Sequence, residues 1–208
     1  MEKEKRKGNE LYVQLIRLTA ELEDELGVSG SLDNLLNRIG ELAEENPSGT
    51  VWNQCFVTVI NLAADHKKFD LVDVYFDHFQ KAVKPDNLYP KMIALALKSD
   101  MEITKHLAGF EVDLNNVLSN AKSACQIARN KLQDYRVQAW TVGLCGECQI
   151  LLNKGDGEEK LRKAMRMRKS SGENTKVYRK WLHRISKYPL LLPHTKNLLE
   201  KEMVRTGM

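Results

Sequence analysis

The chain has 208 residues, of which 42% are apolar and 29% charged, with a formal net charge of +4. This composition excludes a disordered chain, and no apolar run approaches the roughly 18 residues that would span a bilayer. The N-terminus lacks the apolar stretch of a secretory signal, and four cysteines do not make a disulfide framework. We therefore expect a globular intracellular protein of the cytoplasm, without a membrane partner.

Leucines spaced three and four residues apart begin the helical pattern. They predict a helix over residues 11–22, which ends near Gly27, and a second helix from Ser31 to residue 42, before the sequence NPSG. Because only a short link separates the two helices, we expect residues 1–46 to form a helical hairpin.

Helical spacing continues along the rest of the chain, and strand signals are nearly absent. Further helices are expected over residues 51–65, 69–83, 88–98, 113–124, 135–152 and from 158 onward, followed by two helices capped by Thr175 and Thr195. We predict an all-α protein, a helical bundle or short α-solenoid of about ten helices in hairpins. Its regions are an N-terminal hairpin (1–46), a central helical-repeat-like core (50–155) and a basic C-terminal helical region (156–208).

A possible repeat covers residues 50–100. Thr50-Val51-Trp52-Asn53 opens it, Phe69-Asp70 and Phe76 fall in its second helix, and Lys84-Pro85-Asp86 closes it. These residues resemble pentatricopeptide repeats, which are helical hairpins of about 35 residues. The resemblance implies a base-reading role for Asn53, whereas Pro90 occupies the matching place in the next unit and departs from the pattern.

Residues 134–168 resemble a second kind of repeat. The sequence YRVQAWTVGLCGECQILLNKGDGEEKLRKAMRMR is similar to a tetratricopeptide-type helical hairpin. Because relatives of that type mostly bind proteins, this resemblance implies a protein-binding adaptor.

Cys145 and Cys148 have the spacing of a metal-binding or redox pair. A structural zinc site usually needs four ligands, and no second pair of this kind follows. The preceding residues AWTVGL continue a helical pattern, whereas a redox motif would follow a strand. We interpret the two cysteines as small, partly buried helix residues, with a metal or redox site as the alternative.

An acidic stripe gives a second candidate site. His66, Asp70, Asp73 and Asp77 would share one helix face if the helix were unbroken, an arrangement that suits a divalent metal and phosphoester hydrolysis. Lys67 and Lys68 favour a bend at this point, and Val72, Phe76 and Phe79 supply an apolar face opposite the stripe. We therefore interpret the stripe as solvated, and an enzyme as the minority hypothesis.

Positive charge gathers between Lys160 and Lys187, where eleven basic residues face Glu173 alone. Within TKVYRKWLHRISK, the positions of Lys176, Lys180, Arg184 and Lys187 would form one basic helical stripe. Trp181 lies on an adjacent stripe suited to packing, which also contains Val177, Ile185 and Tyr188. Like charges four residues apart destabilise a helix, a cost that a polyanionic partner would explain.

These observations favour a non-enzymatic RNA-binding protein without a cofactor, within a ribonucleoprotein or viral assembly. An acidic protein surface is the alternative partner, and a helical-repeat adaptor or a metal-dependent phosphohydrolase is the alternative function. The sequence leaves the oligomeric state open. The predicted RNA-binding residues are Arg162, Lys163, Arg166, Lys169, Lys176, Arg179, Lys180, Arg184 and Lys187.

Overall fold

A computed structural model describes residues 57, 58, 60, 61, 63–83, 87–131, 134–172, 175–189 and 191–208. Every regular element among these residues is a helix, which confirms the all-α prediction for the described part of the chain. The chain divides into two compact units, residues 1–84 and 85–208. The predicted hairpin of residues 1–46 lies outside the described residues, so the expected total of about ten helices stays a prediction.

The unit of residues 1–84 contains helix α4, Phe69–Ala82, as its described complete helix. Its apolar face contains the buried side chains of Phe69, Val72, Tyr75 and Phe79, at spacings of three and four residues. A turn precedes α4, where Lys67 takes the left-handed conformation with a φ of 57°. The helix therefore begins where the sequence predicted.

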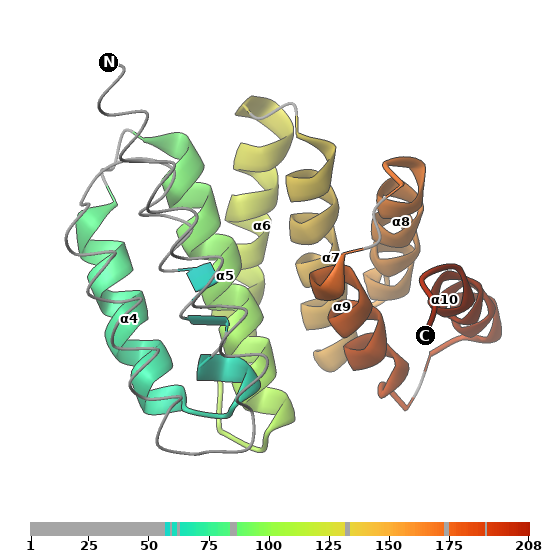
Figure 1. Cartoon of the computed structure of the whole chain (residues 1–208), viewed down its shortest axis with the longest axis horizontal. Coiled ribbons are helices and arrows are strands. Elements are labelled where there is room, and N and C mark those ends of the chain that lie inside the picture. The colour runs from blue at the N-terminus through green and yellow to red at the C-terminus, as the bar shows by residue number, and fades with distance from the viewer. Residues whose placement is uncertain are drawn as a thin grey trace. The chain divides into compact units, whose positions relative to one another are not determined.

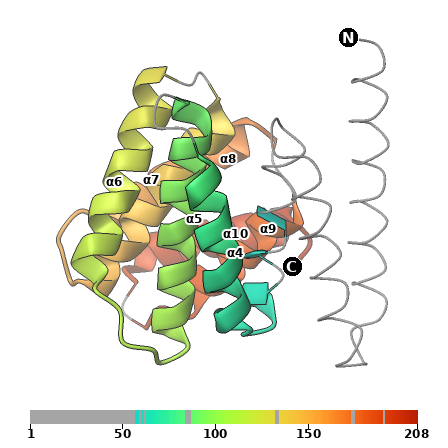
Figure 2. The same ribbon diagram turned by 90° about the vertical axis from the view of Figure 1, so that its left-hand side faces the viewer.

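Six helices lie among the described residues of the unit 85–208 (Figure 1). They are α5 (Leu88–Leu107), α6 (Leu114–Lys131), α7 (Tyr135–Leu151), α8 (Gly157–Ser170), α9 (Lys176–Ser186) and α10 (Pro193–Arg205). Helix α5 packs against α6, α6 against α7, and α7 against α8, while α10 packs against both α8 and α9. Figure 2 shows α5, α6 and α7 from the left-hand side of Figure 1, after a turn of 90° about the vertical axis. None of these described helices combines the length and apolar character needed to cross a bilayer.

Helix α5 continues well beyond its predicted end at Lys98. The hydroxyls of Ser99 and Thr104 donate to backbone carbonyls four residues earlier, so these side chains bond within the helix instead of ending it. The chain turns only at Gly109, whose φ of 92° favours glycine. The extension brings Asp100 and Thr104 to the region that α7 and α9 share.

Side-chain caps account for several helix starts. Asp113 accepts hydrogen bonds from the backbone at the start of α6, and Thr175 accepts one from the Tyr178 N–H at the start of α9, as predicted. The cap predicted at Thr195 is wrong, because α10 begins at Pro193 and Thr195 lies buried inside its first turn. Glu158 of α8 accepts the Leu192 N–H there at 2.8 Å.

Glycines allow α7 to approach its neighbours closely. A Cβ at Gly146 would lie 2.8 Å from the carbonyl oxygen of Gly157, and a Cβ at Gly143 would lie 2.7 Å from the ring of Trp181. These distances are shorter than real Cβ contacts, so the crossings of α7 with α8 and α9 require glycine at both positions.

The core under α8, α9 and α10 is aromatic and aliphatic. Trp181, Ile185 and Tyr188 are buried in it, as predicted, but Val177 is 63% exposed. Its expected place is taken by Tyr178, which is fully buried. Tyr178 and Leu182 extend the buried face on the side away from Val177, so the apolar face shares Trp181, Ile185 and Tyr188 with the predicted stripe and excludes Val177.

Candidate nucleic-acid interface

Arg184 is the centre of a charged network beneath the predicted basic surface. Its Nε and Nη2 atoms each donate to a carboxylate oxygen of Glu147 at 2.8 Å, and Nη1 lies 2.5 Å from an oxygen of Asp100. The Glu147 side chain is fully buried, and that of Arg184 is 20% exposed. The prediction that Arg184 faces solvent and contacts phosphate is therefore wrong, because two internal carboxylates bind its guanidinium.

Aromatic donors complete the same network. Glu147 also accepts hydrogen bonds from Trp181 Nε1 at 2.7 Å and from the Tyr188 hydroxyl at 2.8 Å, while Asp100 accepts one from Trp140 Nε1 at 3.2 Å. Burial and the neighbouring Glu147 carboxylate raise the pKa of Tyr188 above its ordinary value. Burial lowers the pKa of Arg184, but Asp100 and Glu147 more than offset it, so Arg184 stays charged. The network joins α5, α7 and α9.

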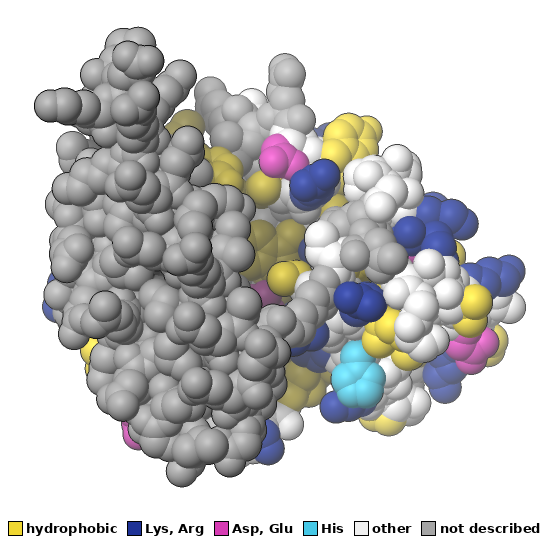
Figure 3. Space-filling view, viewed as in Figure 1, with side chains coloured by type: hydrophobic (Ala, Val, Ile, Leu, Met, Phe, Trp, Pro, Cys, Tyr) yellow, Lys and Arg dark blue, Asp and Glu magenta, His cyan; other side chains and the backbone are white. Residues whose placement is uncertain are grey.

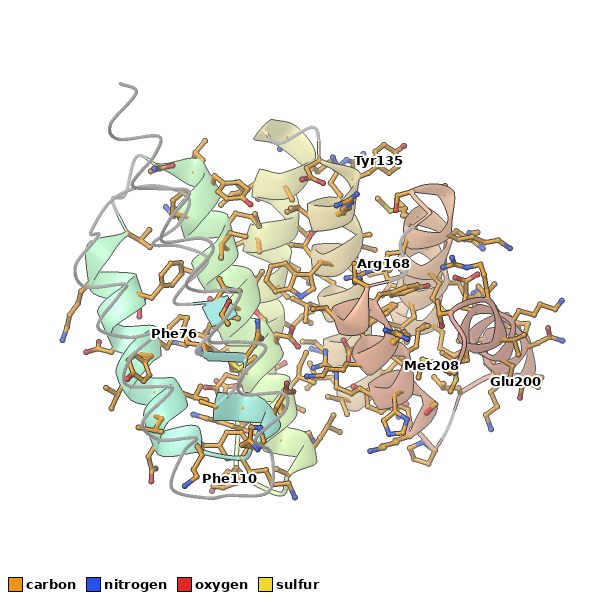
Figure 4. The ribbon with its side chains drawn as sticks, viewed as in Figure 1. Phe76, Phe110, Tyr135, Arg168, Glu200 and Met208 are labelled. Carbon is orange, nitrogen blue, oxygen red and sulfur yellow. The ribbon has the colours of Figure 1, made fainter. Side chains whose placement is uncertain are left out.

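A second buried carboxylate, Glu202 of α10, binds donors from α9 and from its own helix. It accepts hydrogen bonds from the Tyr178 hydroxyl at 3.0 Å and from Arg205 Nη2 at 2.8 Å, and the Lys169 ammonium lies 4.0 Å away. Arg168 points from α8 toward α9 (Figure 4), and its guanidinium carbon lies 5.0 Å from the centre of the Tyr178 ring. Arg168 is thus part of the core.

A third carboxylate, Glu158, holds the predicted site residue Arg162. The Arg162 guanidinium donates to the Thr195 hydroxyl at 2.7 Å and lies 3.6 Å from Glu158. Thr195 in turn donates to Glu158 at 2.5 Å. Arg162 therefore links the start of α10 to α8, and its positive charge is paired with the Glu158 carboxylate.

The remaining predicted cations of α8 and α9 lie at the surface. The exposed residues are Lys163, Arg166, Lys169, Arg179, Lys180 and Lys187, and the side chain of Lys176 lies outside what the structure describes. Figure 3 shows Lys and Arg side chains over the part of the unit that contains α8, α9 and α10. Helix α9 contains no acidic residue, and α8 contains none after Glu159. We call these six exposed residues the basic surface.

The CxxC cysteines lie in the middle of α7, and both are buried thiols. Burial raises the pKa of the Cys148 thiol to about 12, which disfavours the thiolate that a metal would need. Across the described residues, no group of three or more His, Cys, Asp or Glu side chains could hold a metal ion. The helical location and burial agree with the interpretation of the pair as small helix residues.

The acidic stripe does not lie on one unbroken helix. His66 lies in the turn before α4, whereas Asp70, Asp73 and Asp77 lie within α4. Asp77 pairs with Lys81 at 2.5 Å on the exposed face of the helix. The condition on which the metal-dependent phosphohydrolase alternative rested, an unbroken helix from His66 to Asp77, is therefore not met.

Sequence reasoning missed Glu147, the acid that binds Arg184. A signal for it was present, because Glu147 is the one acidic residue in the otherwise uncharged stretch from Val137 to Leu152. A carboxylate on a helix that is apolar on all sides is expected to need a cationic partner. The sequence did not indicate that the partner would be Arg184, 37 residues further along.

The chain was compared with protein-family models, curated proteins and solved structures, and these comparisons identify no family for it. No protein-family model, curated protein or solved structure was found to match the chain.

Proposed function

We propose that the protein is a non-enzymatic, intracellular RNA-binding protein whose basic surface contacts backbone phosphates. The observation that carries this proposal is the separation of charge within α8 and α9. Carboxylates of the fold bind Arg162 and Arg184, whereas the other predicted cations of α8 and α9 whose side chains the structure describes are exposed, and among these Lys169 also lies 4.0 Å from Glu202. Exposed positive charge raises the local concentration of a polyanion.

The arrangement supports binding to backbone rather than reading of bases. Trp181, Tyr178 and Tyr188 are buried, so the aromatic rings of this region are unavailable as stacking platforms for bases. Lys and Arg at an exposed surface bind phosphate oxygens, which carry little sequence information. We therefore expect affinity for many RNA sequences. The resemblance of residues 50–100 to RNA-binding helical repeats is the reason for choosing RNA over DNA, and we propose a short α-solenoid for the whole chain.

The experiment is a salt titration of the full chain with single-stranded RNA, with DNA of the same sequence as comparison. Each neutralised phosphate should contribute about 0.7 to the slope of log affinity against log salt, so six contacts would give a slope of roughly −4. Binding that is absent at low salt, or that does not change with salt, would contradict the proposal. If the chain binds DNA more tightly than RNA, the basic surface remains the proposed binding site, but the proposed ligand becomes DNA.

A protein-binding adaptor is the second candidate, favoured by two exposed apolar side chains at neighbouring helix ends. Val177 at the start of α9 is 63% exposed, and Val204 at the end of α10 is 76% exposed. The two ends are neighbours, because the Arg205 guanidinium lies 6.0 Å from the centre of the Tyr178 ring. An adaptor should retain a partner protein after nuclease treatment and in high salt, whereas RNA-mediated capture should be lost under both conditions.

A further inference from the structure

The aromatic rings of the basic C-terminal helices are held inside the fold. From α8 to α10 the chain has three Phe, Tyr or Trp residues, Tyr178, Trp181 and Tyr188, and each is more than nine-tenths buried. The Tyr178 hydroxyl donates to the buried Glu202 at 3.0 Å. Trp181 Nε1 and the Tyr188 hydroxyl donate to Glu147 at 2.7 and 2.8 Å. A ring that turned outward would remove a donor from a buried carboxylate, so none of the three can stack on a base without disrupting the fold.

Three of the planar guanidinium groups of α8 and α9 are bound inside the fold as well. The guanidinium carbon of Arg168 lies 5.0 Å from the centre of the Tyr178 ring and 5.2 Å from that of Trp181. Carboxylates of the fold bind Arg162 and Arg184. Four of the six residues of the basic surface are lysines, whose ammonium groups bind phosphate as point charges and have no flat face to stack on a base. The basic surface therefore offers mainly charge.

A surface of this kind suits a duplex better than a single strand. A protein that binds single strands gains about 5-fold to 150-fold in affinity for each base that stacks on an aromatic ring. In a duplex the bases already stack on one another, so no ring is needed. Two strands also present phosphates more densely, one charge for about 1.7 Å of axis in double-stranded DNA against about 3.4 Å for one of its strands. Double-stranded RNA is recognised mainly through its phosphates and 2′-hydroxyls.

Contacts between helices fix the scaffold under the basic surface. Arg162 of α8 donates to Thr195 of α10 at 2.7 Å, and Arg184 of α9 donates to Glu147 of α7 at 2.8 Å. The exposed cations therefore stand on helices that need no ordering when a ligand binds. A duplex is stiff as well, whereas a single strand loses conformational freedom when it is held against a rigid surface. Without stacking, nothing at this surface offsets that loss.

We propose that the ligand of the basic surface is double-stranded RNA, bound through its phosphates, in preference to single-stranded RNA. The inference rests on the proposed function, because it names the form of RNA that the same surface binds. Tyr135, at the start of α7 (Figure 4), is 61% exposed, the largest exposed fraction of any Phe, Tyr or Trp that the structure describes. It lies on a helix outside the basic surface, and we expect it not to stack on RNA.

The test measures fluorescence anisotropy of the full chain with an unstructured RNA strand of about 16 nucleotides, and with the duplex of that strand and its complement. At the same low salt concentration the duplex should bind at least about fivefold more tightly, which is the contribution of a single stacked base. Equal or tighter binding of the single strand would overturn this inference and leave the proposed function in place. A lack of binding to both would overturn the proposed function as well.

Variants that add or remove an exposed ring test the physical reason. Val177 is 63% exposed and lies three residues before Lys180 on α9, so Val177→Trp adds a ring beside the basic surface without a change of charge. It should raise affinity for the single strand by about fivefold, and affinity for the duplex by less than about twofold. The control Val177→Leu should change neither. An equal gain for strand and duplex would contradict the stacking argument.

Tyr135→Ala removes the exposed ring of α7 and should leave both affinities within about twofold of the parent. A loss of about fivefold or more for the single strand alone would show that Tyr135 stacks on bases, and would overturn the inference. The ratio of the two affinities in the parent protein decides the question even where a variant folds poorly.

Discussion

The two sides of α8 and α9 use positive charge in different ways. On the inner side, Arg168 and Arg184 contact aromatic rings or carboxylates of neighbouring helices, and Arg162 contacts Glu158 of its own helix and the Thr195 hydroxyl of α10. On the outer side, Lys163, Arg166, Arg179, Lys180 and Lys187 are exposed. The comparison teaches that high local charge does not by itself define a binding surface, since part of it stabilises the fold.

Chemistry explains why the inner positions are all arginine. The planar guanidinium offers several donors in a fixed geometry, so Arg184 can bind both oxygens of Glu147 and also reach Asp100. A lysine at position 184 has a single nitrogen and could not satisfy both carboxylates in this way. The outer positions mix lysine and arginine, and no fixed donor geometry is required of side chains that are exposed.

The largest effect is expected where an inner pair is broken. Arg184→Gln leaves the buried Glu147 carboxylate without its cation, and should lower the free energy of unfolding by about 3 to 5 kcal/mol. Urea denaturation followed by circular dichroism would measure the loss.

The double variant Glu147→Gln/Arg184→Gln is the control for this effect. It removes both charges and leaves two amides that can bond to each other, so it should be more stable than Arg184→Gln alone. If Arg184→Gln is as stable as the parent, the inner pairs do not stabilise the fold and the distinction between the two sides fails.

A smaller loss is expected at the helix crossing on the inner side. Gly146→Ala places a Cβ 2.8 Å from a backbone oxygen of α8, and such overpacking typically costs about 1 to 3 kcal/mol. Gly155→Ala is the matched control, because a Cβ there would have nothing within 4 Å. Thermal melts of the two variants should therefore differ. Equal melting temperatures would show that α7 and α8 pack less closely than described.

The smallest effect on stability is expected on the outer side. Arg166→Gln/Arg179→Gln changes one exposed cation on each helix, and surface changes of this kind stay within about 0.5 kcal/mol. The same urea denaturation experiment applies. A loss above 1 kcal/mol would mean that these residues also support the fold, and their assignment to the basic surface would need revision.

Most helix positions could be predicted from the sequence, because they depend on neighbouring residues. Features that depend on contacts between distant residues could not be predicted. Asp113 and Thr175 cap their helices as predicted, because a cap depends on residues two or three positions away. The cap at Thr195 was wrong, because Glu158 of another helix accepts the hydrogen bonds at the start of α10. The end of α5 was predicted too early, since Ser99 and Asp100 lie inside the helix and bond to Val117 of α6 and Arg184 of α9, contacts that helical spacing does not reveal.

The residues of the candidate site also divide into those that local spacing predicts and those that depend on contacts between distant residues. Spacing identified the basic residues and the inward direction of Trp181, since both follow from helical periodicity. Spacing could not separate Arg184 from Lys180, because the difference depends on Glu147 of α7 and Asp100 of α5.

The most direct test of RNA binding by the basic surface compares the salt dependence of three proteins. These are the parent, Arg166→Gln/Arg179→Gln, and the control Lys91→Gln/Lys122→Gln, which loses the same charge from exposed positions of α5 and α6. Fluorescence anisotropy with single-stranded RNA should show weaker binding of the first variant at low salt. Its slope of log affinity against log salt should be flatter by roughly 1.4 if both phosphate contacts are lost, while the control keeps the slope of the parent. If the two variants bind alike at every salt concentration, the basic surface is not the RNA-binding site and the central claim is wrong.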